Sequence, residues 1–274
     1  MKNALFLVDA GSRVGLGHIS RCIMLAKMLK TLKVEPYFLV KKNVEIIKML
    51  NELGFGFFVL PRKDRTKIAT IFHIHKKTKF ACLIVDVREN LNESFIKKIK
   101  QISKVVIIGN STNPNNFTSD LVIWPEIKEQ YPSDMILSKP RNLLVGNNYV
   151  LLGNVISSKK IRRESNRILV SMGGTDKRHL LEKIIRSFKI HKHNFHVDIV
   201  ITKFYKNTKK IIELVKNDNR FTVIQNQNNL IPLMQRAKLG IFTFGVTAYE
   251  SFYCGLVSMT ISHSKENDRA AKKM

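Results

Sequence analysis

A histidine in a glycine-containing loop near the start of the chain could act as a general base. The stretch at residues 12–21, SRVGLGHISR, lies between an apolar run and a stretch of helical periodicity. Gly15 and Gly17 permit backbone conformations closed to other residues and let a ligand come close to the main chain. His18 is predicted in the first turn of a helix, where the positive end of the helix dipole favours the neutral imidazole. A neutral imidazole can accept a proton, so His18 is a candidate base; capping or packing at the turn is the alternative.

This loop does not match a dinucleotide fingerprint. In the pattern Gly-x-Gly-x-x-Gly the third glycine would fall at Ser20, and the second predicted strand ends in Lys41 and Lys42, where a ribose-binding carboxylate is needed. We therefore expect no nicotinamide or flavin, and no other cofactor is indicated.

The second half of the chain contains a loop suited to a phosphate. SMGGTD at residues 171–176 follows a predicted strand and places Gly173, Gly174 and Thr175 before a helix predicted from about Lys177. Exposed amide groups at a helix start form an anion site. Thr175 and Asp176 are also ordinary N-cap residues, so helix initiation alone is the alternative.

A further strand–glycine–helix junction, FTFGVTAYES at residues 242–251, adds a carboxylate. Gly245 and Thr247 precede Glu250, which is predicted in the first turn of a helix. Its carboxylate can accept two hydrogen bonds from the vicinal diol of a ribose while the amides of the turn face phosphate. A glutamate near a helix start also favours the helix dipole without any ligand. Neither loop is specific alone, but the two together in one domain describe a nucleotide-diphosphate site.

Other catalytic and metal-binding patterns are weaker. His73 and His75 lie two residues apart on a basic helix and point in different directions, and carboxylates are scarce near them and near the histidines at 191, 193 and 196. We therefore expect no metal site. The chain has no Gly-x-Ser-x-Gly elbow for a serine triad and no Walker A lysine motif.

Short apolar runs rich in β-branched residues alternate with amphipathic stretches, which predicts two α/β domains. Continuous apolar runs such as CLIV and VVII suit a parallel sheet covered by helices on both faces. The first domain is predicted at residues 1–156 and the second at residues 167–274, with the polar stretch NVISSKKIRRESN at their boundary as a linker. The second is expected to be short at its C-terminus. Two such Rossmann-like domains are expected to face a cleft at the carboxyl ends of their strands.

The net charge of +26, from 47 Lys and Arg against 21 Asp and Glu, attracts phosphates of any kind. Basic runs are spread along the whole chain, which favours solvated faces over a specific nucleic-acid surface. A bias in genomic composition is a further explanation of the charge. Contact with a membrane is expected to be peripheral at most, because no clear apolar anchor accompanies the basic groups.

Cysteine usage and hydropathy indicate the compartment. Cys22, Cys82 and Cys254 are too few and too scattered for a disulfide framework or a Cys-x-x-Cys metal site, so a reduced compartment fits. No run reaches the roughly 18 apolar residues of a membrane span. Because the first predicted strand starts almost at Met1, we expect no signal peptide. We expect a cytoplasmic monomer.

The motifs, taken in order, carry a resemblance. VGLGHISRCIMLA, VSMGGTDKRHLLEKI, FGVTAYES and a closing KEND resemble the UDP-sugar hydrolases of pseudaminic acid biosynthesis, the related spore-coat polysaccharide proteins and the broader glycosyltransferase-B (GT-B) group. The similarity covers nearly the whole chain. The combination Gly-x-Gly-His-x-x-Arg with Met-Gly-Gly-Thr-Asp is quite specific, whereas Gly-x-Thr-x-Tyr-Glu is shared more widely with nucleotide-sugar transferases.

The resemblance implies a GT-B-like enzyme that holds UDP in its C-terminal domain and a deoxy, acetamido sugar against its N-terminal domain. His18 would be the catalytic base for water. The implied substrate-binding residues are Gly15, Gly17, Arg21, Asp86 and Asn267, and the implied UDP-binding residues are Gly173, Gly174, Thr175, Gly245, Thr247 and Glu250. The implied reaction is metal-independent cleavage of the anomeric C–O bond of a UDP-linked diacetamido-trideoxy sugar, with inversion, in nonulosonic (pseudaminic-type) acid or surface polysaccharide biosynthesis.

Three departures from the family pattern fall in the sugar-facing half. Arg88 stands where the family often has an aromatic residue, Gly109 and Asn110 stand where carboxylates are expected, and Gly153 replaces an arginine. They leave two alternatives to the hydrolase: a glycosyltransferase that uses the same nucleotide site, and a nucleotide-sugar-binding protein with lost or altered activity.

Overall fold

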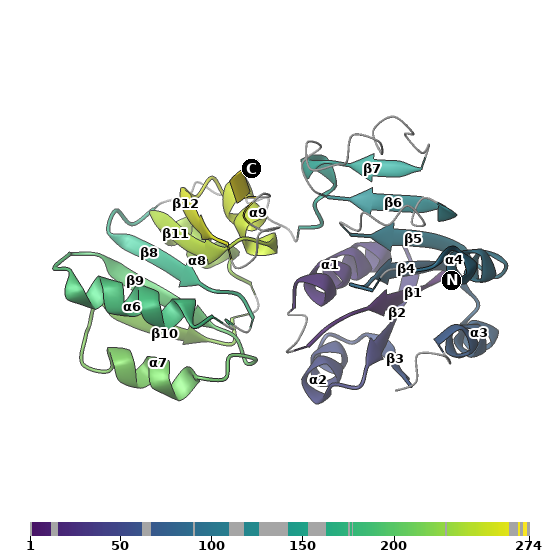
Figure 1. Cartoon of the computed structure of the whole chain (residues 1–274), viewed down its shortest axis with the longest axis horizontal. Coiled ribbons are helices and arrows are strands. Elements are labelled where there is room, and N and C mark those ends of the chain that lie inside the picture. Colours follow the sequence, from purple (N-terminus) through teal and green to yellow (C-terminus); the bar gives the residue numbers. More distant parts are fainter. Residues whose placement is uncertain are drawn as a thin grey trace. The chain divides into compact units, whose positions relative to one another are not determined.

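The chain divides into two compact units, Met1–Leu151 and Leu152–Met274 (Figure 1). The structure is a computed structural model that describes residues 2–11, 16–61, 67–89, 91–109, 118–125, 142–152, 163–174, 176, 178–227, 229–262, 268, 271 and 272. Each unit is an α/β domain built on one parallel sheet, which confirms the predicted fold class. The first unit ends at Leu151, where the sequence analysis extended the first domain to residue 156.

The first unit is a seven-stranded sheet with the strand order β3-β2-β1-β4-β5-β6-β7, and every neighbouring pair is parallel. Its strands are β1 (Lys2–Val8), β2 (Val34–Lys41), β3 (Gly56–Leu60), β4 (Phe80–Asp86), β5 (Lys104–Ile108), β6 (Leu121–Trp124) and β7 (Leu143–Val145). Its helices are α1 (Gly17–Thr31), α2 (Val44–Glu52), α3 (Lys67–Thr78) and α4 (Glu93–Lys100), with a 3-10 turn at Asn147–Tyr149.

The central strands β1 and β4 carry continuous runs of buried apolar side chains, and successive side chains point to opposite faces of the sheet. Leu5 and Leu7 of β1 pack with residues of α3 and α4 in one core cluster, while α1 buries Ile19 and Cys22. Helix starts are fixed locally: the Asn92 side chain accepts the Phe95 N–H at 2.8 Å and so caps α4. The sheet is therefore a rigid support for the loops at its carboxyl edge.

The second unit is a five-stranded parallel sheet with the order β10-β9-β8-β11-β12. Its strands are β8 (Arg167–Ser171), β9 (His196–Ile201), β10 (Phe221–Gln225), β11 (Leu239–Thr243) and β12 (Ser258–Ile261). Its helices are α6 (Leu180–Ile190), α7 (Thr208–Val215), α8 (Ile231–Arg236) and α9 (Val246–Tyr253). Helices α6 and α7 pack on the face that carries Ile168 and Val170, and Leu169 points into a second cluster with residues of α8.

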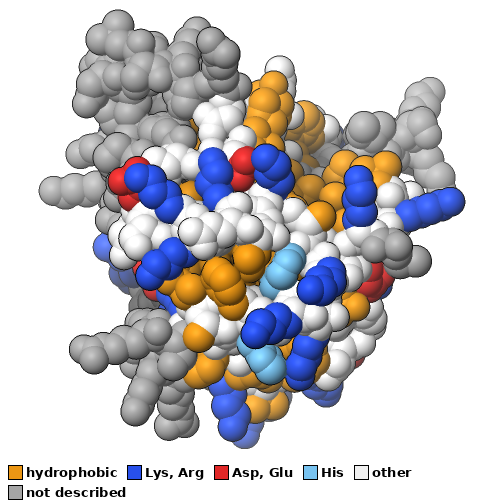
Figure 2. Space-filling view, turned by 90° about the vertical axis from the view of Figure 1, so that its right-hand side faces the viewer, with side chains coloured by type: hydrophobic (Ala, Val, Ile, Leu, Met, Phe, Trp, Pro, Cys, Tyr) orange, Lys and Arg blue, Asp and Glu red, His pale blue; other side chains and the backbone are white. Residues whose placement is uncertain are grey.

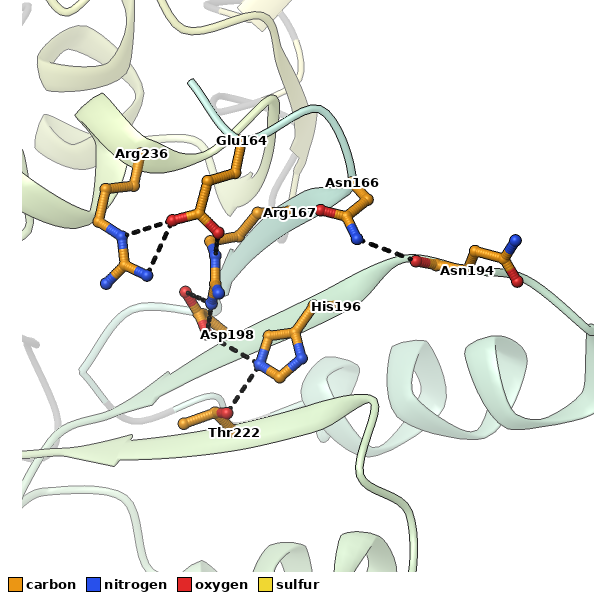
Figure 3. A network of polar contacts seen from close by, with 8 residues as sticks. All are labelled: Glu164, Asn166, Arg167, Asn194, His196, Asp198, Thr222 and Arg236. Carbon is orange, nitrogen blue, oxygen red and sulfur yellow. Dashed lines mark hydrogen bonds and ion pairs between the residues drawn. The ribbon is translucent and has the colours of Figure 1, made fainter. Parts of the chain in front are cut away.

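A polar network ties together the amino-terminal edge of the second sheet (Figure 3). The Arg167 guanidinium contacts Glu164 at 2.6 Å and the buried Asp198 carboxylate at 2.8 Å. His196 contacts Thr222 Oγ1 at 2.8 Å and Asp198 Oδ1 at 3.6 Å. The three strands β8, β9 and β10 are thus joined at the edge opposite to their carboxyl ends.

The surface is rich in cationic side chains. Figure 2 shows one face of the molecule, on which Lys and Arg side chains are dispersed among apolar and neutral groups. In the described part of the chain, no helix has the length and apolar character that crossing a membrane requires.

Candidate functional site

The strand order of the first sheet brings His18 and Asp86 together. Helix α1 begins at Gly17, beyond the loop that leaves β1, so His18 stands in the first turn of α1 at the carboxyl edge. Asp86 is the last residue of β4, which pairs with β1 so that Val8 lies opposite Asp86. Because the strand order reverses between β2-β1 and β4, this edge is a topological switch point, where open α/β sheets bind ligands.

The Asp86 carboxylate holds both His18 and Arg21. His18 Nδ1 lies 2.6 Å from Asp86 Oδ1. Arg21 donates from Nε to Oδ2 and from Nη2 to Oδ1, both at 2.5 Å. The Asp86 side chain has no solvent exposure, whereas 19% of the His18 side chain is exposed. Since a carboxylate accepts the hydrogen bond, Nδ1 carries a proton, and Nε2 is the ring nitrogen that Asp86 leaves available.

The electrostatics of this cluster keep Asp86 ionised. Burial raises the pKa of the Asp86 carboxyl, but the Arg21 charge and the hydrogen bonds from Arg21 and His18 together hold that pKa below its ordinary value. Burial, reinforced by the Asp86 charge, raises the pKa of the Cys22 thiol well above its ordinary value. The protonated thiol donates to Asp86 Oδ2 at 3.4 Å.

Asp86 was predicted to contact the substrate, and this stays a prediction. Its carboxylate is fully buried, and its two oxygens already accept from His18, Arg21 and Cys22. The contact of Asp86 Oδ1 with Nδ1 fixes the orientation of the His18 ring. Arg21, also predicted to contact the substrate, places its guanidinium on Asp86, with 18% of its side chain exposed.

The other predicted residues of this half are distributed around the same edge. Gly17 is exposed as the first residue of α1. The Arg88 N–H donates to Asp9 Oδ2 at 3.0 Å. Gly109 directly follows β5 and has φ +150°, and a Cβ placed there would lie 4.0 Å from Arg21 Nη2. Gly15, Asn110 and Gly153 lie outside the described residues.

Asp9 belongs to this edge and was not singled out from the sequence. It follows β1, is 7% exposed, and has Lys41 of β2 3.4 Å from its Oδ1. Its N–H donates to the Asp86 carbonyl at 3.1 Å. The signal was present, because NALFLVD and FACLIVD both end an apolar strand with an aspartate.

In the second unit, the backbone of the loop after β8 favours glycine at position 173. Gly173 has φ +74°, and a Cβ there would lie 3.2 Å from Thr243 Oγ1. A side chain is disfavoured on both grounds. The Gly174 carbonyl accepts a hydrogen bond from Thr202 Oγ1 at 2.7 Å, which connects this turn to the end of β9.

The helix after this loop starts later than predicted. It was predicted from about Lys177, but α6 begins at Leu180. Asp176 takes the left-handed conformation with φ 36°, and its carboxylate accepts the N–H groups of Leu180 and Leu181, both at 2.9 Å. The capping alternative therefore describes Asp176, and these two amides are already used.

The loop after β11 keeps its amides open to a ligand. Helix α9 begins at Val246, and its N-cap Gly245 supplies no side chain. Among the described residues, the amides of Val246 and Thr247 donate to no other group, and the first bonded amide is that of Ala248, which donates to the Gly245 carbonyl at 3.0 Å. Two free amides at the positive end of a helix bind anions.

Glu250 lies one turn deeper in α9 than predicted. It was predicted in the first turn, but it is the fifth residue after Gly245, and α9 has no acidic residue in its first turn. Its side chain is half-buried, and burial raises the pKa of the carboxyl to about 7. The group can therefore change charge in the physiological pH range.

Thr243 completes this edge and was missed in the sequence. It is the last residue of β11, and its hydroxyl lies against Gly173. The loops after β8 and β11 meet because these two parallel strands are neighbours. The strand order reverses beside β8, which makes this edge a second topological switch point. A hydroxyl residue at a strand end directly before a glycine loop was the available signal. Thr175 and Asn267 lie outside the described residues.

Comparison with known sequences finds two relatives of low identity, and no protein-family model matches the chain. It is 25% identical to the uncharacterized protein MJ1062 of Methanocaldococcus jannaschii, over 93% of this chain and 54% of that protein. It is 22% identical to the spore coat polysaccharide biosynthesis protein SpsG of Bacillus subtilis, over 96% of this chain and 78% of SpsG. The chain thus spans about half the length of MJ1062.

Solved structures share the fold of the whole chain. MurG of Acinetobacter baumannii has a TM-score of 0.66 at 13% identity, over 99% of this chain and 84% of that one. Phytolacca americana UGT2, complexed with UDP-2-fluoro-glucose and pterostilbene, has a TM-score of 0.65 at 11% identity, over 98% and 82%. The UDP-GlcNAc 2-epimerase of Methanocaldococcus jannaschii has a TM-score of 0.59 at 14% identity, over 99% and 92%. The two α/β units therefore have the GT-B fold.

Replacing Arg21 should reverse the pH dependence that Asp86 confers. In the wild-type chain the lowered pKa stabilises the fold above pH 4, and this contribution is lost as pH falls through the folded pKa. In Arg21→Met, burial dominates and the pKa of Asp86 rises above its unfolded value, so the ionised form costs stability. We expect a loss of about 3 kcal/mol at pH 7 that shrinks toward pH 4, measured by chemical denaturation.

Two control variants accompany this measurement. Arg21→Lys keeps the positive charge and should keep the wild-type sign of the pH dependence. Arg186→Met removes a 57% exposed guanidinium and should change little. A loss in Arg21→Met that is independent of pH would contradict the assignment.

Glu250 should destabilise the fold as it ionises. Its pKa is raised from 4.5 to about 7, so stability falls as pH rises between these values. Glu250→Gln removes the cost, and its advantage over the wild type should grow from near zero at pH 4.5 to about 3 kcal/mol above pH 7. Thermal and chemical denaturation across this range measures the difference; Glu213→Gln, on the exposed side of α7, should show no such trend.

Proposed function

We propose that this chain hydrolyses a UDP-linked diacetamido-trideoxy sugar to UDP and the free sugar, in nonulosonic (pseudaminic-type) acid or surface polysaccharide biosynthesis. The observation that carries the proposal is the 2.6 Å contact between His18 Nδ1 and the buried Asp86 carboxylate. It provides a fixed base at the carboxyl edge of one sheet. The relation to SpsG supports the polysaccharide context, and the names of UGT2 and of the epimerase support a UDP-sugar ligand.

In the proposed reaction, His18 activates water. The water oxygen attacks the anomeric carbon while His18 Nε2 takes one proton from it. The anomeric C–O bond breaks, and its electron pair leaves with the diphosphate. The imidazolium that forms is stabilised by Asp86, which Arg21 keeps ionised. Attack opposite the leaving group inverts the anomeric centre.

The second unit would hold the leaving group. The free amides of Val246 and Thr247 and the hydroxyl of Thr243 are suited to charge that develops on the diphosphate, which makes the step independent of metal. Gly173, Gly174 and Gly245 let the phosphates approach the main chain. Glu250 would accept the ribose hydroxyls. Thr175 is proposed beside the phosphates, and Gly15, Gly17 and Asn267 beside the sugar.

The fold favours one alternative of the same chemistry. MurG and UGT2 share the architecture, and in a glycosyltransferase His18 would take its proton from an acceptor hydroxyl instead of water. The same cluster serves both reactions, so the acceptor decides between them. A nucleotide-sugar-binding protein without turnover would keep only the binding of the nucleotide that we propose for the second unit.

Turnover without an acceptor is the direct test. The purified protein should release UDP from a UDP-diacetamido-trideoxy hexose in buffer alone and in the presence of a chelator, and oxygen from labelled water should enter the sugar and not UDP. His18→Ala should abolish turnover while the affinity for UDP stays within about threefold, because His18 contributes a proton acceptor and not a UDP contact. His73→Ala, on the exposed side of α3, is the matched control.

Each other result assigns a different function. UDP release that requires an added sugar or lipid acceptor indicates the transferase. UDP binding without turnover over a panel of UDP-sugars indicates the binding protein. Full turnover in His18→Ala removes His18 from the mechanism.

The affinity for UDP should follow the ionisation of Glu250. Hydrogen bonds from the ribose diol favour the carboxylate over the neutral acid, and the pKa of Glu250 is about 7. UDP affinity should therefore rise about tenfold more between pH 6 and pH 8 in the wild type than in Glu250→Gln. Isothermal titration at several pH values measures it, and the variant cancels the titration of UDP itself. Parallel profiles would remove Glu250 from the ribose site.

A further inference from the structure

The end of α6 and its connection to β9, residues 189–195, combine exposed apolar side chains with basic ones and take no part in the proposed reaction. This segment lies at the left-hand edge of the second unit in Figure 1, at the amino-terminal edge of its sheet. Ile190 is 77% exposed and Phe195 is 44% exposed. We call this segment the α6–β9 tip. Its two large apolar side chains stand in water at a cost that burial against a partner would remove.

The tip is held in shape by contacts at its base. The His193 ring lies 5.2 Å from Phe188, which packs on the core, and 5.8 Å from Phe195. His193 Nδ1 accepts the Phe195 N–H at 3.2 Å, so Nε2 donates to the Phe188 carbonyl at 3.0 Å. The His193 ring thus lies between Phe188 and Phe195 and links the exposed Phe195 ring to a residue of the core.

The polar network fixes the far end of the tip. Asn166 Nδ2 donates to the Asn194 carbonyl at 3.5 Å (Figure 3). His196, the first residue of β9, forms a hydrogen bond with the Thr222 hydroxyl. Arg220 Nη1 donates to the His191 carbonyl at 3.2 Å. The exposed apolar groups are therefore presented by an ordered segment.

The charge around the tip is positive. Residues 183–197 contain no Asp or Glu, and they include Lys183, Arg186, Lys189 and Lys192. The acids on the neighbouring elements are already in ion pairs: Glu182 with Arg186 and Lys210, Asp218 with Arg220. Lys189 and Lys192 are both exposed and flank Ile190 in the sequence, and Lys189 Nζ donates to the Leu214 carbonyl at 2.8 Å.

We infer that the α6–β9 tip docks on an anionic lipid bilayer. Aliphatic and aromatic side chains within a cationic surface match the boundary between head groups and acyl chains, where lysines contact lipid phosphates through their flexible stems. A nucleic acid would satisfy the charges but would leave Ile190 in water. The positive charge of the chain strengthens the approach to such a surface.

Vesicle sedimentation of the full chain tests the inference. The wild type should bind phosphatidylcholine vesicles that contain phosphatidylglycerol and should not bind vesicles of phosphatidylcholine alone. Ile190→Ser with Phe195→Ser should lower binding at least about tenfold. The control is Leu32→Ser with Val44→Ser in the first unit, which removes side chains that are 71% and 77% exposed and should leave binding within about twofold.

A second pair of variants separates the charge from the apolar contact. Lys189→Gln with Lys192→Gln should weaken binding and reduce its dependence on salt, whereas Lys76→Gln with Lys77→Gln on α3 makes the same change in charge elsewhere. Circular dichroism confirms that each variant is folded.

Several results would overturn the inference. They are equal binding to neutral vesicles, no binding to either kind, equal losses in the tip and control pairs, or a loss of binding to a single-stranded RNA in the tip variants without any vesicle binding. None of them bears on UDP-sugar hydrolysis, which is measured without lipid.

Discussion

The buried carboxylate of Asp86 is the constraint on which the first unit's site depends. An ionised group without solvent exposure is stable only when its oxygens are saturated, and here Arg21 supplies two hydrogen bonds and His18 a third. The contact also acts on His18, because an Asp86 oxygen that accepts a hydrogen bond from Nδ1 fixes that nitrogen as a protonated one. The buried Asp86 carboxylate therefore orients the imidazole of His18, 19% of whose side chain is exposed.

The two units share one strand arrangement, but it brings different groups together in each unit. In each sheet, strand order reverses beside the first strand, and the loops after two adjacent strands converge at the carboxyl edge. In the first unit this brings a carboxylate to an imidazole and fixes a base. In the second it brings Gly173 against Thr243 and places the α9 amides nearby. The carboxylate of Asp176 occupies two amides at the start of α6, whereas the amides of Val246 and Thr247 in α9 have no partner among the described residues.

Strand positions and glycine turns could be predicted because their causes are local. Apolar runs such as LIVD end at the sheet edge whatever their neighbours, and Gly173 lies in a turn directly after β8, as the strand–glycine pattern predicted. The contacts of Asp86 with His18 and Arg21 could not be predicted. They depend on β4 lying beside β1, and no short sequence pattern encodes that strand order. The late start of α6 has a similar origin. Asp176 and His179 both take left-handed conformations, which local propensity disfavours and which the bonds to Leu180 and Leu181 compensate.

Gly109 shows how the departures from the family pattern relate to the base. A side chain at this position would point at Arg21 Nη2, so an acidic residue there would compete with Asp86 for the guanidinium. With glycine, Arg21 can give both Nε and Nη2 to Asp86, and the carboxylate keeps its charge at full burial. Glycine at this position therefore leaves the contact between Asp86 and His18 Nδ1 intact.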